Sequence, residues 1–155
     1  MRLEVHHPTP GGAKASLGRV SDGFDFLSYR FHHDHTGVAA SAKAAFKESV
    51  RGVLRDGRKA IEKDATRVRR ATPMYCQTLD AVDRRIRGWG DAFREADNRL
   101  EFNQLDDWAQ REIDRFHAWY FTFITNKSAD ERRRACGVAL LKDTPPPFLI
   151  DPIDG

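Results

Sequence analysis

The clearest hydrophobic pattern in the chain has a helical period and lies between residues 79 and 93. Its large apolar residues step by three, four, three and four: Leu79, Val82, Ile86, Trp89 and Phe93. Residues at this spacing share one face of a helix, so the stripe predicts a helix that packs in a bundle. Gly88 and Gly90 flank the tryptophan, and we expect these small residues to let another backbone approach closely.

The same type of pattern predicts a helix on each side of this one. The earlier helix is expected to start at Ser41, a suitable N-cap, and to end at Ala71–Pro73, where the proline fits the first turn of the next helix. Gly52 and Gly57 weaken it by up to about 1 kcal/mol each relative to alanine, which allows a kink. The later helix is expected to start near Asn103. Its buried side would consist of Leu105, Trp108, Ala109, Ile113, Phe116, Tyr120 and Phe123.

The region before residue 41 shows short apolar runs of the kind that form strands. Three strands are predicted there: Leu3–His6, Phe24–Phe31 and Val38–Ala40. Within the second, Phe24, Phe26 and Leu27 are expected to pack beneath the helices. Tyr29 suits burial and ligand contact equally well, because its ring is apolar and its end is polar. Near the other end of the chain, Ser128 is expected to cap a short last helix.

These elements predict a mainly α-helical fold with a small N-terminal β-hairpin element and an extended Pro-rich tail. The expected divisions are a β element at 1–40, a three-helix bundle at 41–126, and a short helix with the tail at 127–155. A chain of 155 residues is long enough to bury a core of its own. Its two cysteines lack the spacing of a zinc motif or a disulfide framework. No apolar run reaches about 18 residues, so we expect no membrane span and a cytoplasmic protein.

The net charge of +3 is unevenly distributed along the chain. Residues 43–95 contain fourteen basic and eight acidic side chains, whereas 97–114 contain six acidic and two basic ones. Such a basic half predicts an anionic partner, and a solvated helix surface with Glu48 and Asp56 as ion-pair partners is the alternative. The predicted nucleic-acid-binding residues form a stripe on the first helix and a cluster on the second: Lys43, Lys47, Arg51, Arg55, Arg58, Arg84, Arg85 and Arg87.

Few other residues suggest chemistry. His32–His35 contains metal-ligand types, but a polar turn fits it better, because a metal site needs three or four converging ligands. Asp106 and Asp107 are adjacent on a predicted helix, where their side chains diverge by about 100° and cannot easily hold one ion. The tryptophans and phenylalanines on the helical stripes are expected to be core residues rather than base-stacking platforms. We therefore predict no catalytic residue, metal or cofactor.

Two segments together resemble a known family. "DGFDFLSYRF" (Asp22–Phe31) resembles the strand that closes the catalytic palm of bacterial group II intron and retron-type reverse transcriptases, and "LEVHHPTPGGAK" (Leu3–Lys14) resembles the strand and loop upstream of it. "IRGWGDAFREADNRLEFNQLDDWAQREI" (Ile86–Ile113) resembles the thumb helices of these enzymes. The order and spacing match from Leu3 to about Tyr120. Primer-grip-like residues in this register are Phe26, Leu27, Ser28 and Tyr29.

The resemblance implies a fragment that binds nucleic acid. The family's catalytic motif, an aromatic residue followed by x-Asp-Asp, has no counterpart in the palm register, so we expect no polymerase activity from the chain alone. Ser28 replaces the family's glycine, which argues against a tight turn there. The implied partners are an RNA or RNA–DNA duplex and a separate palm and fingers polypeptide. Two alternatives remain: a stand-alone helical RNA- or DNA-binding protein, and a protein-interaction bundle.

Overall fold

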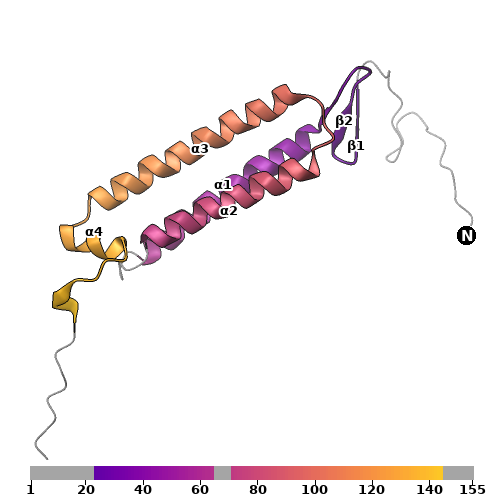
Figure 1. The fold of residues 1–155 in the computed structure, drawn as a ribbon. Coiled ribbons are helices and arrows are strands. Elements are labelled where there is room, and N and C mark those ends of the chain that lie inside the picture. The colour runs from indigo at the N-terminus through magenta and orange to yellow at the C-terminus, as the bar shows by residue number, and fades with distance from the viewer. Residues whose placement is uncertain (1–22, 65–70, 145–155) are drawn as a thin grey trace, which may run out of the picture.

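Three long helices lie side by side, with a small antiparallel sheet at one end and a short helix at the other (Figure 1). This computed structural model describes residues 23–64 and 71–144. The helices are α1 (Ala40–Asp64), α2 (Ala71–Ala92), α3 (Arg99–Thr125) and α4 (Ala129–Ala135), followed by a 3₁₀ turn at Leu141–Asp143. The predicted mainly α-helical fold with a small N-terminal β element is therefore confirmed. The strand predicted at Leu3–His6 and residues 145–155 of the predicted tail lie outside the described residues.

The sheet differs from the prediction in where the chain turns. Its strands are β1 (Phe24–Phe26), β2 (Tyr29–Phe31) and β3 (Thr36–Val38), in that order. The single strand predicted at Phe24–Phe31 is wrong, because the backbone reverses at Leu27 and Ser28, whose φ angles are 48° and 69°. A two-residue loop with both φ angles positive matches the twist of a hairpin, and it normally contains glycine or asparagine. The tight turn thus forms although Ser28 replaces the family's glycine.

The hairpin also leaves its apolar side chains in solvent. Phe24, Phe26 and Leu27 are 51%, 60% and 77% exposed, so the expectation that they pack beneath the helices is wrong. The reason is that β1 is the outer strand of the sheet, whereas β2 contacts the end of α2 through Tyr29 and β3 contains the fully buried Val38. Phe24 stacks on Phe31 across the hairpin, with 5.4 Å between the ring centroids. The outer strand is therefore an apolar surface that the described residues leave uncovered.

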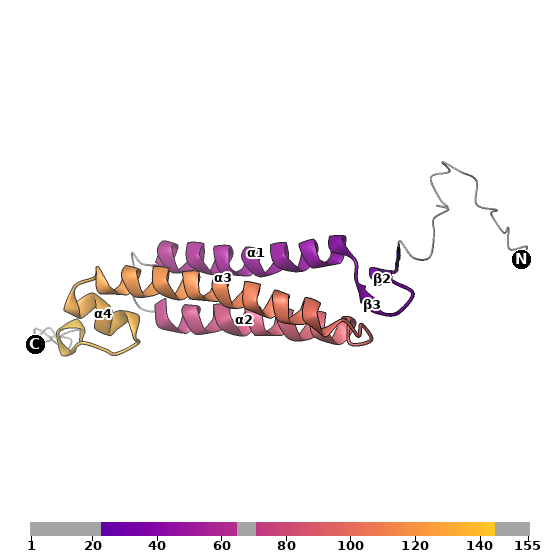
Figure 2. The same cartoon turned by 90° about the horizontal axis from the view of Figure 1, so that it is seen from above.

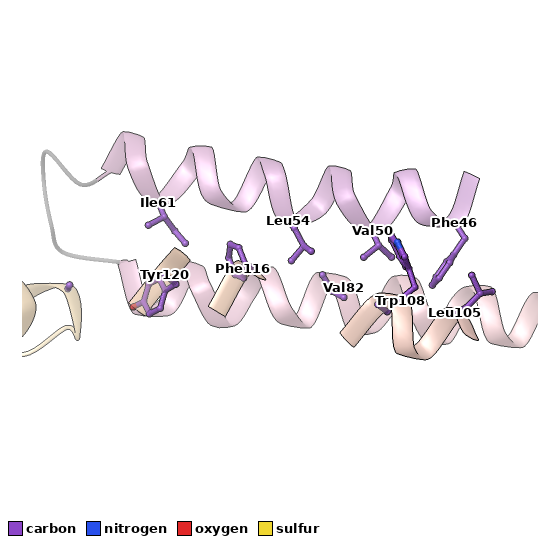
Figure 3. Packing of buried hydrophobic residues seen from close by; sticks show 11 residues of the cluster. Phe46, Val50, Leu54, Ile61, Val82, Leu105, Trp108, Phe116 and Tyr120 are labelled. Carbon is purple, nitrogen blue, oxygen red and sulfur yellow. The ribbon is translucent and has the colours of Figure 1, made fainter. Parts of the chain in front are cut away.

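The core lies between α1, α2 and α3 and follows the predicted helical stripes (Figure 3). Its buried members include Phe46, Val50, Leu54, Ile61, Val82, Leu105, Trp108, Phe116 and Tyr120. Leu79, Ile86 and Trp89 of the α2 stripe are partly buried and pack against this cluster. The apolar periodicity of all three helices therefore identified the residues that form the core, as expected for helices whose stability depends on burying one face.

Close helix packing occurs at a different glycine from the ones predicted. A methyl group on Gly88 or Gly90 would meet nothing within 4 Å, so the expected close approach there is wrong. A methyl group on Gly57 would lie 2.3 Å from Oγ1 of Thr78, so it is here that α1 and α2 come together. Helix α1 runs without interruption through Gly52 and Gly57.

The helix starts agree with local signals to within a few residues. The predicted end of the first helix at Ala71–Pro73 is wrong, because α1 ends at Asp64 and Ala71 begins α2. Helix α1 starts at Ala40, one residue before the expected cap Ser41, and α3 starts at Arg99 rather than near Asn103. Pro73 lies in the first turn of α2, as predicted. Ser128 caps α4 as predicted: Oγ of Ser128 accepts a hydrogen bond from the Glu131 amide at 3.3 Å, and the Ser128 amide donates to Glu131 Oε2 at 2.8 Å. This is a capping box, which satisfies two backbone donors at once.

Tertiary hydrogen bonds fasten the sheet to the helix ends. The Thr36 amide donates to Oδ1 of Asp97 at 2.8 Å, and the Val38 amide donates to Oε2 of Glu101 at 2.9 Å. The Tyr29 hydroxyl donates to the carbonyl of Ala92, at the end of α2, at 2.9 Å. Because these bonds come from β2 and β3 and reach both α2 and α3, they hold the hairpin at a defined position beside the bundle.

Glu101 makes this attachment dependent on pH. Partial burial raises the pKa of Glu101, but hydrogen bonds from Lys43 and the Val38 amide outweigh it and hold the pKa below its ordinary value. A group with a lowered pKa in the folded state stabilises fully above its unfolded pKa, and this contribution is lost as the pH falls through the folded value. We therefore expect Glu101→Gln to cost roughly 1 kcal/mol at pH 7 and to weaken the loss of stability at acid pH. Urea unfolding at pH 7 and pH 3 tests this, and an equal cost at both pH values would contradict it.

Among the described residues, no helix combines the length and the apolar composition needed to cross a membrane, as the sequence pattern predicted.

Candidate nucleic-acid interface

The basic stripe on α1 is largely paired with carboxylates of the chain itself. Lys43 contacts Glu101 of α3, and Arg51 contacts Glu112 of α3 at 3.2 Å. Two further ion pairs stay within α1: Arg55 with Glu48 at 3.4 Å, and Arg58 with Glu62 at 2.9 Å. The alternative reading of a partnered helix surface named Glu48 correctly, but the α3 carboxylates that also pair with the stripe come from the acidic segment of the sequence.

Aromatic rings of α3 also contact basic side chains of this stripe. The Lys47 ammonium lies 5.5 Å and the Arg51 guanidinium 5.3 Å from the centroid of the Trp108 ring. The Arg58 guanidinium lies 4.8 Å from the centroid of Trp119. The stripe therefore lies along the junction of α1 with α3, where its charges contribute cation–π contacts and ion pairs that stabilise the bundle.

The three predicted arginines of α2 differ from one another. Arg87 donates from Nε to both carboxylate oxygens of Asp83, at 3.0 and 2.8 Å. This pair raises the pKa of Arg87. Arg84 and Arg85 are exposed, and neither forms an ion pair with any residue in the described part of the chain. Two of the eight predicted basic residues are therefore fully available for an anionic partner, and both lie on the same turn of α2.

Arg84 and Arg85 border a groove of about 490 Å³ between α1, α2 and the hairpin. Small side chains form most of its lining: Ala42, Ala45 and Ser49 from α1, Gly88 and Ala92 from α2, and Ser28 from the hairpin turn. Phe46, Trp89 and Phe93 contribute the larger surfaces. The groove lies on the flank of α1 away from the basic stripe, because residues 42, 45 and 49 are on the opposite side of the helix from residues 47 and 51.

The arrangement of the helices leaves this groove open. Figure 2 shows α1 and α2 as the two outer helices, and Figure 1 shows α3 displaced to one side of that pair. Helix α3 contributes no residue to the lining of the groove. A ligand in this groove therefore contacts α1, α2 and the hairpin turn, and none of the lining residues belongs to α3.

The predicted primer-grip residues do different things in the structure. Ser28 lines the groove, and its carbonyl accepts a hydrogen bond from the Ala39 amide at 2.8 Å, which fixes the turn next to α1. Tyr29 is a structural residue, since its hydroxyl binds the end of α2 and its ring lies 5.3 Å from that of Phe93. Phe26 and Leu27 extend into solvent at the tip of the hairpin. Among these four residues, only Ser28 lines the groove.

The small residues along α1 were not among the predicted site residues. Ala42, Ala45 and Ser49 step by three and four, so the sequence contains a stripe of small side chains at helical spacing. The spacing of these small residues is visible in the sequence, whereas the groove that they line depends on how α1 and α2 pack.

The histidines and aspartates that were considered as possible metal ligands also have defined positions in the structure. His32–His35 forms the turn between β2 and β3, where the rings of His32 and His35 stack at 4.3 Å, so the polar turn is confirmed. The described residues contain no group of three or more His, Cys, Asp or Glu side chains that could hold a metal ion, and His6 and His7 lie outside them. Asp106 and Asp107 are both exposed on α3.

Comparisons of the chain with protein-family models, with curated proteins and with solved structures found no match.

Proposed function

We propose that this chain is the nucleic-acid-binding thumb and primer-grip portion of a reverse transcriptase of group II intron or retron type, and that it holds an RNA or RNA–DNA duplex in the groove between α1 and α2. The observation that supports this most directly is the position of Arg84 and Arg85. Both arginines lack a carboxylate partner among the described residues, and both border the same groove as the hairpin turn at Ser28.

The chemistry of the groove suits a sugar–phosphate backbone. Arginine binds phosphate oxygens through several donors at once, and such contacts position a duplex without reading its sequence. The small side chains of Ala42, Ala45 and Gly88 let a bulky backbone approach the helices. Contacts of this kind to phosphates do not need to reach the edges of the bases. Proteins recognise RNA-containing duplexes in the same way, by shape and phosphate contacts.

The hairpin supports the same assignment. The resemblance to the palm-closing strand implies a palm that continues beyond β1, supplied by a separate palm and fingers polypeptide. Phe24 and Phe26 on β1 are exposed, and an exposed apolar edge strand favours pairing with another strand. In this proposal the palm polypeptide covers β1, and the duplex lies on the opposite side of the turn, next to α1 and α2.

The test is duplex binding at a series of salt concentrations, measured by fluorescence anisotropy with an RNA–DNA hybrid. Affinity falls as salt rises, and each lost phosphate contact makes the slope of log affinity against log salt less steep by about 0.7 to 0.9. Arg84→Gln combined with Arg85→Gln should therefore reduce the steepness of that slope by roughly 1.4 to 1.8. The matched control is Arg51→Gln with Arg55→Gln, which removes the same charge from side chains that are already paired, and which should change the slope much less.

The other outcomes identify the alternatives. A control pair that lowers the slope as much as Arg84 and Arg85 do would place the interface on the α1 stripe. Equal affinity for the hybrid and for B-form DNA would favour a stand-alone nucleic-acid-binding protein. Absence of binding to any duplex would leave the protein-interaction bundle.

A further inference from the structure

A second hollow lies on the other side of Trp89 from the groove, between α2 and α3. It has a volume of about 360 Å³, and five apolar residues form most of its wall: Phe46, Ile86, Trp89, Phe102 and Leu105. The rings of Trp89 and Phe102 meet there with 5.6 Å between their centroids. A concave, mostly apolar hollow of this size with a few polar groups at its edge is typical of a site for a small ligand.

Gly90 forms part of this wall and explains why the hollow exists. A methyl group on Gly90 would meet nothing within 4 Å, so the space beside it is empty rather than filled by a neighbouring helix. Glycine in the interior of a helix is unfavourable relative to alanine. Gly88 has the same open surroundings but borders the groove instead. The two glycines therefore open separate spaces on either side of Trp89.

The edge of the pocket has an excess of negative charge. Its charged residues are Arg87, Asp91 and Asp106. The guanidinium of Arg87 is already bound to Asp83 by two hydrogen bonds, which neutralises it. Asp106 has no ion pair with any described residue. Asp91 also acts on Arg87, whose pKa it helps to raise. The carboxylate of Asp106 is thus available to a cation, and Asp91 adds negative charge beside it.

We infer that this pocket binds a small aromatic ligand that bears a positive charge, with its ring against Trp89 and Phe102 and its ammonium group near Asp91 and Asp106. The aromatic wall favours a flat apolar ring, and the face of Trp89 also attracts a cation that lies close to it. The Arg99 guanidinium already lies 5.2 Å from the centroid of the Phe102 ring, so Phe102 contributes apolar surface to the site. The site differs from the proposed duplex-binding groove in all of its lining residues except Phe46 and Trp89, which border both hollows.

The test uses three probes with one ring system: naphthalen-1-ylmethylamine, naphthalen-1-ylmethanol and naphthalene-1-carboxylate. Binding is followed by NMR shifts of the backbone amides near Gly90 and Phe102. The amine should bind about threefold or more tightly than the alcohol, and the carboxylate should bind most weakly. Replacing Asp91 and Asp106 together by asparagine should remove the difference between amine and alcohol.

The decisive variant is Gly90→Leu, which places a side chain in the pocket and should weaken binding of the amine by roughly tenfold or more. Gly88→Leu is its matched control, and it should leave amine binding unchanged. A Cβ at either position meets nothing within 4 Å, and thermal melting checks that each variant is folded before its binding is compared. Unchanged amine binding in Gly90→Leu, or equal binding of amine and carboxylate to the unaltered protein, would overturn the inference.

Discussion

Trp89→Ala should lower the free energy of unfolding by about 3–5 kcal/mol, the usual cost of truncating a packed aromatic residue. Trp89 of α2 contacts three aromatic rings. The centroid distances are 4.8 Å to Phe46 of α1, 4.7 Å to Phe93 just after α2, and 5.6 Å to Phe102 of α3. Removing the indole would leave these rings without their common partner and would join the groove to the pocket between α2 and α3. Urea unfolding followed by circular dichroism measures the loss.

A conservative variant separates packing from ligand contact. Trp89→Phe keeps an aromatic ring in the same place and should cost much less than Trp89→Ala. Duplex binding should fall in Trp89→Ala only as far as the folded fraction falls. A Trp89→Ala protein that melts at the normal temperature but binds duplex about 1–3 kcal/mol more weakly would show instead that the indole stacks on a base.

Gly57→Ala should destabilise the protein by about 2 kcal/mol, although alanine is the better helix former. The new methyl group would lie 2.3 Å from Oγ1 and 2.4 Å from Cγ2 of Thr78, and the Oγ1 hydroxyl is already bound to the Met74 carbonyl at 2.7 Å. Thr78 is buried on α2, so it cannot turn away, and α1 and α2 would have to move apart.

Gly52→Ala on the same helix is the matched control. Its methyl group would meet only the end of the Arg55 side chain, at 3.7 Å, so this variant should stabilise the protein by up to about 1 kcal/mol. Thermal melting of the two variants should therefore move in opposite directions. A rise in melting temperature for both would mean that α1 and α2 are not in close contact at Gly57.

The candidate site was harder to predict than the fold, because it depends on which groups each side chain contacts. Lys43 and Arg51 stand on a regular basic stripe that is visible in the sequence, and the structure shows them bound to Glu101 and Glu112. Arg84 and Arg85 stand in an ordinary cluster, and the structure leaves them without ion-pair partners among the described residues. The order of charged residues in a sequence does not show which of them pair in the fold. Lys43 and Arg51 pair with carboxylates that lie 58 and 61 residues further along the chain.

The sequence by itself determined the features that depend on near neighbours. The stripe through Val82 and Ile86 predicted helix α2 and its buried face, and Ser128 predicted the start of α4. Helical period and capping act over three or four residues, so the local sequence specifies them. The turn at Leu27 and Ser28 was missed because neither residue is typical of a left-handed backbone.

Only the tertiary structure decided how these elements meet. Gly57, Gly88 and Gly90 look alike in the sequence, yet one lies against Thr78 and the other two border open space. Which glycine is crowded depends on the position and rotation of a second helix, and these are set by the packing of side chains from distant segments. For the same reason the groove at Arg84 and the pocket at Gly90 could be found only after the helices had been placed, since each hollow is formed by residues from at least two elements.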